Sequence, residues 1–358
     1  MCAQTEFWDN AKGLLEEWYV ACTSKELKKD QPFAATLYGK KIVLFRQKDG
    51  RAAALLDQCV HRGVPLSEGK VKNGCVSCPY HGWSYQADGH VAYIPSVNGK
   101  FFPEKPHPFK QRSFDVCEQD GVVWIYLGEK PEHLRPAVFK LPFYDQPGWV
   151  SYYMVGKYDG EMGAVAQNIM DVTHTIFVHE GWFRSESGKA VDATIEVEPR
   201  KVVVEYHDHD ADVGMMPWLT NPHGAEQVHR DSFIAPNITL VEYHWGEPSG
   251  MVFNSLISPV GPYESRVYTC VSYKFPIPKL MAQALMPAVN AYTWVVNNQD
   301  IKILSARRKG LENMPMTHSH SVRGDMAHIA LEKILDALRH DQQLAPSFIG
   351  KRPMQFQI

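Results

Sequence analysis

The pattern of hydrophobic and polar positions changes about a third of the way along the chain. Up to about Leu127, short apolar runs are separated by Lys-Asp-Gly, Asn-Gly and Ala-Asp-Gly, which are typical turn sequences. Short runs bounded in this way predict strands, and together they predict a small β-domain. The expected strands are 41–45, 51–56, 74–78, 90–94 and 122–127.

A proline-rich passage across 131–147 indicates a boundary between domains. After it, 159–177 predicts a helix with Asp159 at its N-cap. Mixed apolar and polar positions then predict an antiparallel sheet, and helices return near the end. The expected strands are 201–206, 232–245, 251–257 and 267–275, and the expected helices are 279–286, 288–308 and 323–340. The tail 341–358 has no clear periodicity.

These patterns predict an α+β chain, and a length of 358 residues suits two compact domains. The second domain is expected to combine an antiparallel sheet with flanking helices. The expected division is an N-terminal segment 1–17, the β-domain 18–130, a linker 131–150, the second domain 151–345 and a C-terminal tail 346–358.

Composition narrows the possible partners. The chain is 44% hydrophobic and 22% charged, as in ordinary soluble proteins, and its 37 basic and 40 acidic residues are well mixed. A net charge of -3 argues against nucleic-acid or anionic-membrane binding. The chain start lacks a signal-like basic and apolar pattern, and no apolar run approaches a membrane span. A cytoplasmic protein is expected.

Seven cysteines over this length do not form the dense, even set of a disulfide-stapled fold, so metal or redox use explains them better. Cys59 and His61 lie in 59-CVHRG-63, and Cys78 and His81 lie in 78-CPYHGW-83. Two thiolates and two imidazoles can hold a structural zinc ion or an iron–sulfur cluster, or can pack together for unrelated reasons. Cys75 forms a CxxC with Cys78, but a buried strand position explains it better.

The stretches 59-CVHRGVPLSEG-69 and 78-CPYHGW-83 resemble the Rieske [2Fe-2S] motif. The resemblance implies that Cys59 and Cys78 hold one iron, while His61 and His81 hold the other. Histidine ligation raises the reduction potential above that of plant-type ferredoxins.

The helix expected at 159–177 carries a second candidate constellation. Asn168, Asp171 and His174 recur every three residues along one broad face. His179 follows His174 by five residues, so an ideal helix would place it on another side. Convergence of the two histidines on one metal would need a π-type bulge or a helix end.

Two imidazoles and one carboxylate form the 2-His-1-carboxylate site of non-haem Fe(II) oxygenases, which leaves positions open for O2 and substrate. The carboxylate should come from elsewhere in the fold. The downstream candidates are Asp300, Asp325 and Glu312.

With both motifs in this order, nearly the whole chain resembles the Rieske non-haem iron oxygenases, in the α-subunit-only branch that includes vanillate, dicamba and caffeine demethylases. The resemblance implies a helix-grip-like catalytic domain in which His174, His179 and Asp300, in 297-NNQDIKIL-304, bind one mononuclear Fe(II). It also implies a head-to-tail homotrimer, in which Asp171 bridges to His81 of the neighbouring subunit. Asn168 is either a support for that junction or a plain amide on the helix surface.

The resemblance implies a terminal oxygenase that uses O2 to monooxygenate a small organic substrate by hydroxylation or by O- or N-demethylation. Electrons would come from NAD(P)H through a separate flavin or iron–sulfur reductase, with or without a ferredoxin, because no GxGxxG opens a helix here. The alternatives are a Rieske electron carrier and a zinc-stabilised interaction domain. Both leave His174, His179 and Asp300 without a role.

The sequence does not determine the substrate or the reaction subtype, because the same metal centres can catalyse hydroxylation, demethylation, desaturation and N-oxygenation. The pocket walls are expected from strands within 200–275 and from the helix around 292–300. Polar candidates for the wall are Asn237, Thr239, Tyr243, Asn254 and Tyr273. The stretch 207–212 and His318 and His320 are expected to be exposed polar loops.

Overall fold

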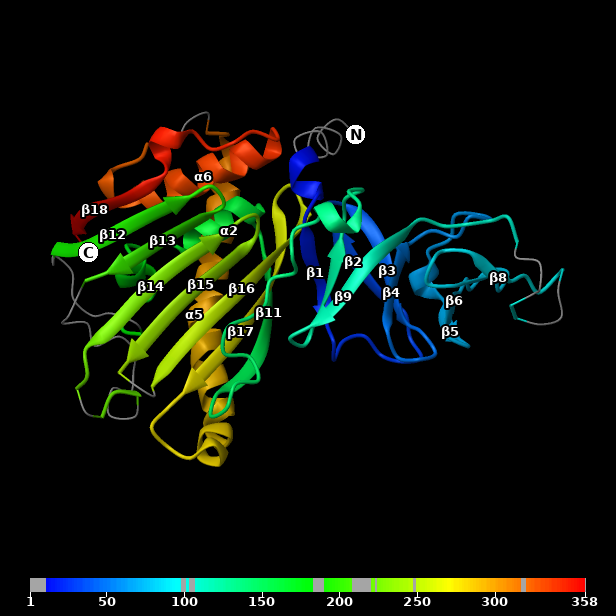
Figure 1. Cartoon of the computed structure of the whole chain (residues 1–358), viewed down its shortest axis with the longest axis horizontal. Helices are drawn as coiled ribbons and strands as arrows, with labels where there is room; N and C mark the ends of the chain where they lie inside the picture. Colours follow the sequence, from blue (N-terminus) through cyan, green and yellow to red (C-terminus); the bar gives the residue numbers. More distant parts are fainter. Residues whose placement is uncertain are drawn as a thin grey trace. The chain divides into compact units, whose positions relative to one another are not determined.

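The structure is a computed structural model that describes residues 11–97, 101–102, 107–182, 190–207, 220–222, 224–246, 249–316 and 320–357. The chain forms two compact units (Figure 1). The first contains Leu15–Lys140, and the second contains the chain from Leu141 onward together with a short segment that ends at Leu14.

The first unit contains two antiparallel sheets. A six-stranded sheet has the order β1-β10-β9-β4-β3-β2, and a four-stranded sheet has the order β5-β6-β7-β8. The larger sheet comprises β1 (Trp18–Thr23), β2 (Phe33–Leu37), β3 (Lys40–Arg46), β4 (Ala52–Leu56), β9 (Ser113–Gln119) and β10 (Val122–Tyr126). The smaller comprises β5 (Lys70–Lys72), β6 (Cys75–Ser77), β7 (Ser84–Tyr85) and β8 (Val91–Tyr93). All strands expected in this region are confirmed.

One apolar core joins the two sheets of the first unit. Val43 and Phe45 of β3 share a buried cluster with Val76 of β6 and Tyr85 of β7. The alternating side chains of short strands supply this core, because every second residue points to the same face. The loops that follow β4 and β6 are thereby anchored at the edge of the core.

The second unit is built on an eight-stranded antiparallel sheet of order β11-β17-β16-β15-β14-β13-β12-β18. Its strands are β11 (Val150–Tyr158), β12 (Ala190–Glu198), β13 (Lys201–Tyr206), β14 (Gln227–Ile234), β15 (Ile238–Trp245), β16 (Gly250–Gly261), β17 (Glu264–Lys274) and β18 (Gly350–Gln357). Its helices include α2 (Met162–Ile169), α3 (Thr175–Val178), α5 (Lys279–Asn313) and α6 (Met326–Arg339). Figure 1 shows α5 crossing behind the strands, where it packs against β11. The predicted α+β class is confirmed.

The predicted helix at 159–177 is wrong in its extent and its cap. The structure has two short helices there, α2 and α3, and Glu161 occupies the N-cap position of α2. Asp159 instead accepts a hydrogen bond from Ser305 of α5 at 2.7 Å. A tertiary contact therefore recruits the carboxylate that the sequence alone assigns to a local cap.

Three other predicted elements differ in the structure. The strand expected at 232–245 is two strands, β14 and β15, separated at Pro236, which has no N–H to donate to a ladder. The helices expected on either side of Pro287 form one continuous helix, α5, with Pro287 inside it. The tail contains β18, which pairs with β12 and buries Met354. In the part of the chain that the structure describes, no helix combines the length and apolar character needed to cross a membrane.

Two candidate metal centres

Two loops of the first unit share one hydrogen-bond pattern. In the first, the Cys59 N–H donates to the Val64 carbonyl at 2.8 Å, and in the second, the Cys78 N–H donates to the Trp83 carbonyl at 2.8 Å. Each loop therefore begins at a cysteine and closes five residues later. The two cysteines are 2% and 4% exposed, so the loops present two buried thiols from equivalent positions.

A glycine closes the inner turn of each loop. Gly63 and Gly82 donate their N–H groups to the carbonyls of Cys59 and Cys78, at 2.8 and 3.1 Å. Their φ angles are +76° and +72°, in the left-handed region that glycine adopts without a steric penalty. The tight turns require glycine at these positions.

The histidines of the two loops face each other. The ring centroids of His61 and His81 lie 4.7 Å apart, and Trp83 stacks on His61 at 4.7 Å with an interplanar angle of 6°. Among the described residues, Nδ1 of His61 is buried without a hydrogen-bond partner. A buried ring nitrogen without a partner next to two buried thiols fits a metal-ligand set.

The thiols and their surroundings also fit a metal cluster. Burial, together with Cys59, raises the pKa of the Cys78 thiol, so a bound metal would be needed to stabilise its thiolate. The Tyr85 hydroxyl lies 3.1 Å from Cys59 Sγ and also accepts the Val60 N–H at 3.1 Å. Cys75 lies on β6, where burial raises the pKa of its thiol to about 11. Its fully buried strand position agrees with the packing role expected from the sequence.

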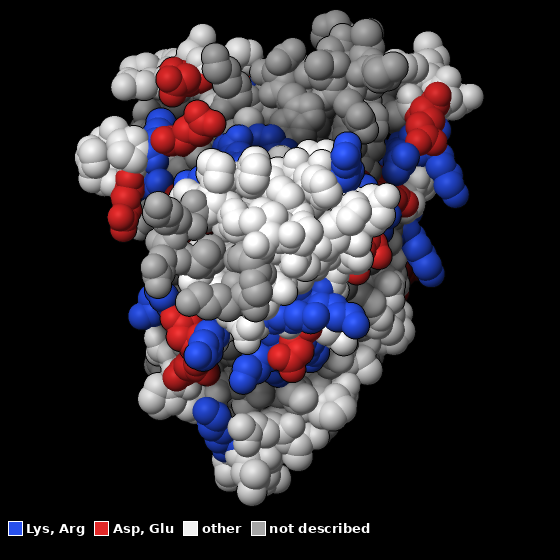
Figure 2. All heavy atoms as spheres, turned by 90° about the vertical axis from the view of Figure 1, so that its right-hand side faces the viewer, with Lys and Arg blue, Asp and Glu red and all other residues white. Residues whose placement is uncertain are grey.

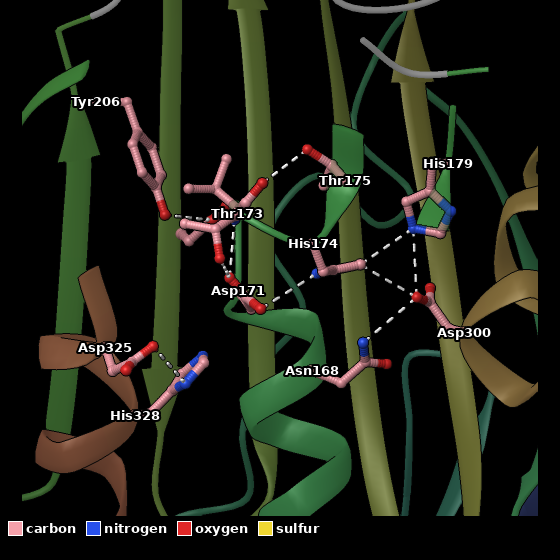
Figure 3. A network of polar contacts seen from close by, with 12 residues as sticks. Asn168, Asp171, Thr173, His174, Thr175, His179, Tyr206, Asp300, Asp325 and His328 are labelled. Carbon is pink, nitrogen blue, oxygen red and sulfur yellow. Dashed lines mark hydrogen bonds and ion pairs between the residues drawn. The ribbon is translucent and has the colours of Figure 1, made fainter. Parts of the chain in front are cut away.

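The second candidate centre lies in the second unit, where three side chains converge (Figure 3). His174 Nε2 lies 3.2 Å from His179 Nε2, and Asp300 Oδ1 lies 3.2 Å and 3.3 Å from these two nitrogens. The three atoms form a nearly equilateral triangle. A metal ion could bind all three atoms at ordinary metal–nitrogen and metal–oxygen distances, and its other coordination positions would remain open.

A helix end brings the two histidines together. Helix α2 stops at Ile169, and His174 and His179 occupy the N-cap and C-cap positions of the four-residue helix α3. The two histidines, five residues apart, therefore converge at a helix end, which is one of the two arrangements that the sequence allowed. The single helical face expected for Asn168, Asp171 and His174 is wrong, because only Asn168 lies on α2.

The carboxylate comes from α5. Asp300 completes the triangle, whereas Asp325 contacts His328 and the Val322 N–H, and Glu312 pairs with Arg308. The structure therefore selects Asp300 from the three candidates.

Two amides contact the ligand triad. Asn168 donates through Nδ2 to Asp300 Oδ1 at 3.4 Å, and Gln299 Oε1 lies 2.8 Å from His179 Nδ1. When His179 Nε2 binds a metal, its Nδ1–H donates to Gln299, which fixes the tautomer and the ring orientation. The contact from Gln299 was not predicted, although its position next to Asp300 in 297-NNQD-300 was a signal that could have suggested it.

Asp171 lies on the side of His174 away from the triangle. Its Oδ2 is 3.7 Å from His174 Nδ1, within ion-pair range but beyond hydrogen-bond length. Its Oδ1 accepts from the N–H and hydroxyl of Thr173, at 2.8 and 2.6 Å. Burial opposes ionisation of Asp171, but His174, Thr173 and His328 outweigh it and lower its pKa to about 2. Asp171 is therefore a carboxylate at neutral pH.

The triad and Asp171 are joined by ion pairs. Burial opposes protonation of His174, but Asp171 and Asp300 outweigh it and raise the pKa of His174 to about 9. Burial also opposes ionisation of Asp300, yet His174 and His179 lower the pKa of its carboxyl. A metal cation would replace this proton as the counter-charge of the carboxylates.

A cavity opens onto the triad between the sheet and the helices. Its sheet wall uses every second residue, as the pleat requires: His229 and Asp231 on β14, Val241 and Tyr243 on β15, and Phe253 and Ser255 on β16. The α5 wall consists of Tyr292, Thr293, Val296, Asn297 and Asp300, as expected from the sequence.

Of the polar residues expected in the wall, Tyr243 lines the cavity, whereas Asn237, Thr239, Asn254 and Tyr273 are fully buried outside it. His229 and Asp231 were not among the expected residues. Most of 207–212, and His318, lie outside the described residues.

A β-domain with paired Cys-His loops, followed by a sheet-and-helix domain with a 2-His-1-carboxylate triangle, defines an iron-dependent oxygenase. The chain matches the Rieske [2Fe-2S] domain over residues 17–124 and the vanillate O-demethylase oxygenase C-terminal domain over residues 158–341. The second match covers more than half of the chain.

Individual relatives agree with these family matches. The dicamba O-demethylase oxygenase component of Stenotrophomonas maltophilia is 31% identical over 70% of each chain. The vanillate O-demethylase oxygenase subunit of a Pseudomonas species is 36% identical over 45% of this chain and 44% of that protein. Crystallised dicamba monooxygenase bound to dicamba has the same fold, with a TM-score of 0.75 and 21% identity over 91% of this chain and 98% of that one. Pseudomonas putida NdmA aligns with a TM-score of 0.70 and 20% identity over 93% and 92%.

The chain belongs to the Rieske non-haem iron oxygenases. It is an oxygenase component and a monooxygenase that uses a Rieske [2Fe-2S] cluster and a mononuclear iron centre. The fold and the family that the sequence predicts are confirmed.

Proposed function

We propose that this enzyme hydroxylates or demethylates a small, largely apolar organic molecule in the cavity of its second unit. The residues assigned to the cluster are Cys59, His61, Cys78 and His81, and those assigned to the mononuclear iron are His174, His179 and Asp300. The observation that carries the proposal is the triangle of ligand atoms at 3.2–3.3 Å in the wall of a cavity whose other walls are mostly apolar.

The bound cluster supplies single electrons, and the bound mononuclear iron supplies the site at which O2 is reduced. The protein contributes orientation and exclusion of water. Gln299 holds the ring of His179, and Asn168 holds the carboxylate of Asp300. Val241, Phe253 and Val296 provide apolar walls that would seat an organic molecule against the triad.

Asp171 is assigned to the electron route between the cluster of one subunit and the iron of the next in a homotrimer. Its carboxylate lies 3.7 Å from His174 Nδ1, on the side of the imidazole opposite the nitrogen that faces the triangle. A carboxylate there can connect His174 to a donor outside the cavity. Asn168, the possible support for this junction in the sequence, contacts Asp300 instead.

Oxygenase components of this family work with separate reductases and ferredoxins and form oligomers. The partner proposed here is a flavin or iron–sulfur reductase that uses NAD(P)H, with or without a ferredoxin, in the cytoplasm. Figure 2, which faces the β5–β8 side, shows uncharged side chains at the centre of that face, with Lys and Arg interspersed with Asp and Glu around them. Val60 and Tyr80 of the cluster loops are 41% and 63% exposed, as a docking face for a redox partner or a neighbouring subunit would require.

Iron and acid-labile sulfide analysis, with an EPR spectrum of the dithionite-reduced protein, tests both metal assignments. Wild type should contain three irons and two sulfides per chain, in the proportions that the two proposed centres require. His174→Ala should lose one iron and keep the Rieske signal, while the exposed His340→Ala should match wild type. Two irons per chain in wild type and in both variants would indicate an electron carrier that has no mononuclear iron.

Single turnover with 18O2 tests the reaction. Reduced protein is mixed with dicamba, vanillate or caffeine, the compounds named for relatives or solved structures of this fold. Labelled product or formaldehyde from any of them would support monooxygenation. Oxidation of the cluster with neither a labelled organic product nor formaldehyde, across these and a wider aromatic panel, would contradict it.

A further inference from the structure

A histidine outside the iron triad is clamped in the sheet wall of the cavity. His229 on β14 lies directly opposite Tyr206 on β13 and Tyr243 on β15. Cross-strand partners point to the same face of a sheet, so the three rings form a row. The imidazole stacks on both tyrosines, each at a centroid distance of 4.3 Å, with interplanar angles of 20° and 22°. Its ring plane is therefore held from both sides.

Asp231 fixes the remaining freedom of this ring. His229 Nε2 lies 3.0 Å from Asp231 Oδ1, and the Tyr206 hydroxyl donates to Asp231 Oδ2 at 3.0 Å. His229 and Asp231 are each 3% exposed. Buried charges are normally neutralised by a partner, and His229 is the basic partner of Asp231 among the described residues.

The other ring nitrogen, Nδ1, is not used by Asp231 and is available for one further hydrogen bond. Nδ1 donates when it carries a hydrogen and accepts in the neutral tautomer whose hydrogen is at Nε2. A substrate with an acceptor oxygen would select the forms in which Nδ1 carries the hydrogen.

Nδ1 of His229 has no partner among the described residues, although the atom is buried. A buried polar atom left without a hydrogen-bond partner destabilises the protein. A histidine with only a packing role would be expected to use both nitrogens. His229 instead lines the same cavity as His174, His179 and Asp300.

We propose that the Nδ1–H of His229 binds an acceptor oxygen of the substrate, and that Tyr206, Tyr243 and Asp231 position it for this role. The substrate class is a small apolar, ring-bearing molecule that carries a carboxylate, phenolate or carbonyl oxygen. This inference rests on the proposed function, in which the cavity receives the substrate. His229 is then a binding residue that sets which part of the molecule lies near the iron triad.

Equilibrium binding to the metal-loaded enzyme under anaerobic conditions tests this role. The probes are benzoate and acetophenone, which carry an acceptor oxygen, and toluene, which has the ring alone. Wild type should bind at least one of the first two about tenfold more tightly than toluene, as expected for one buried hydrogen bond. His229→Phe should lose that preference and keep its toluene affinity, and the exposed His207→Phe should behave as wild type. No preference in wild type, or a preference that survives in His229→Phe, would overturn the proposal.

Two further measurements separate this result from others. His229→Gln keeps an N–H donor and should retain part of the preference, whereas loss of folding would remove toluene binding and the Rieske EPR signal together. Asp231→Asn should weaken the preference without changing toluene affinity, because it acts by positioning His229. If the mononuclear iron is absent but the His229-dependent preference remains, the proposed function fails and the binding role stands.

Discussion

Asn168 Nδ2 lies 3.4 Å from Asp300 Oδ1, so an amide on α2 contacts the carboxylate that α5 contributes 132 positions later. The contact joins the two parts of the chain that supply the proposed iron ligands. It orients Asp300 towards His174 and His179, because the oxygen that accepts from Asn168 is the one that faces both imidazoles.

Asn168→Ala should therefore weaken iron retention. Loss of such an outer contact typically lowers metal affinity by about 10–100-fold. The rate of iron loss to a chelator, measured with the Rieske signal as an internal reference, checks this. Gln167→Ala removes a neighbouring amide that contacts the exposed Glu332 and should leave the rate unchanged. Equal rates in wild type and Asn168→Ala would show that packing alone holds Asp300.

Gln299→Ala should also lower iron affinity by about 10–100-fold, because His179 loses the acceptor for its outer N–H. Gln299→Glu retains an acceptor at this position and should recover most of the affinity. Titration of the iron-free protein with Co(II), followed by its visible spectrum, measures both. The exposed Lys302→Ala is a control on the same helix.

Metal uptake should depend steeply on pH. In the metal-free protein the pKa of His174 is raised to about 9 by Asp171 and Asp300 against the opposing effect of burial, so His174 holds a proton at neutral pH. A metal needs the deprotonated nitrogen, and binding must displace that proton. Apparent affinity should rise about tenfold per pH unit between pH 6 and 8. Calorimetry in two buffers of different ionisation enthalpy should show release of about one proton at pH 7. Uptake independent of pH would contradict this assignment.

Asp171→Asn should slow electron delivery while keeping the iron. The substitution removes the charge beside His174 Nδ1 and preserves the shape of the side chain. Oxidation of the reduced cluster, by stopped flow in the presence of O2 and substrate, should slow about 100-fold, the upper range for loss of a contact next to a metal ligand. Mass measurement of the native oligomer should show the same state in both proteins. A normal rate at full iron occupancy would remove Asp171 from the route.

The two loop glycines should differ in their tolerance of alanine. Both have positive φ, so each Gly→Ala change costs about 1 kcal/mol of backbone strain. A Cβ on Gly82 would also lie 2.9 Å from Pro95 Cγ, whereas on Gly63 it meets only the Gln58 side chain at 3.6 Å. Gly82→Ala should therefore lose more cluster, measured as the ratio of visible to ultraviolet absorbance. Equal loss would mean that the backbone conformation alone limits assembly.

The sequence by itself predicted the α+β class of the chain, the candidate cluster loops and the two histidines of the candidate iron site. These features depend on short-range spacing. In 59-CVHRG-63 and 78-CPYHGW-83, the ligands and the glycines that turn the backbone lie within a few residues of each other, so local geometry suffices to arrange them. Asp300 was predicted as a ligand because its motif resembles the corresponding motif of a known family.

The tertiary structure decided what depends on packing between distant segments. Two of these features join residues that are far apart in the sequence: the contact of Asn168 with Asp300 and the pairing of β18 with β12. A third, the end of α2 before Asp171, depends on neighbouring residues from distant parts of the chain. The row of Tyr206, His229 and Tyr243 exists only because three strands adopt one register. A shift of one residue would turn His229 to the other face of the sheet, and sequence periodicity contains no information about which strand lies opposite which.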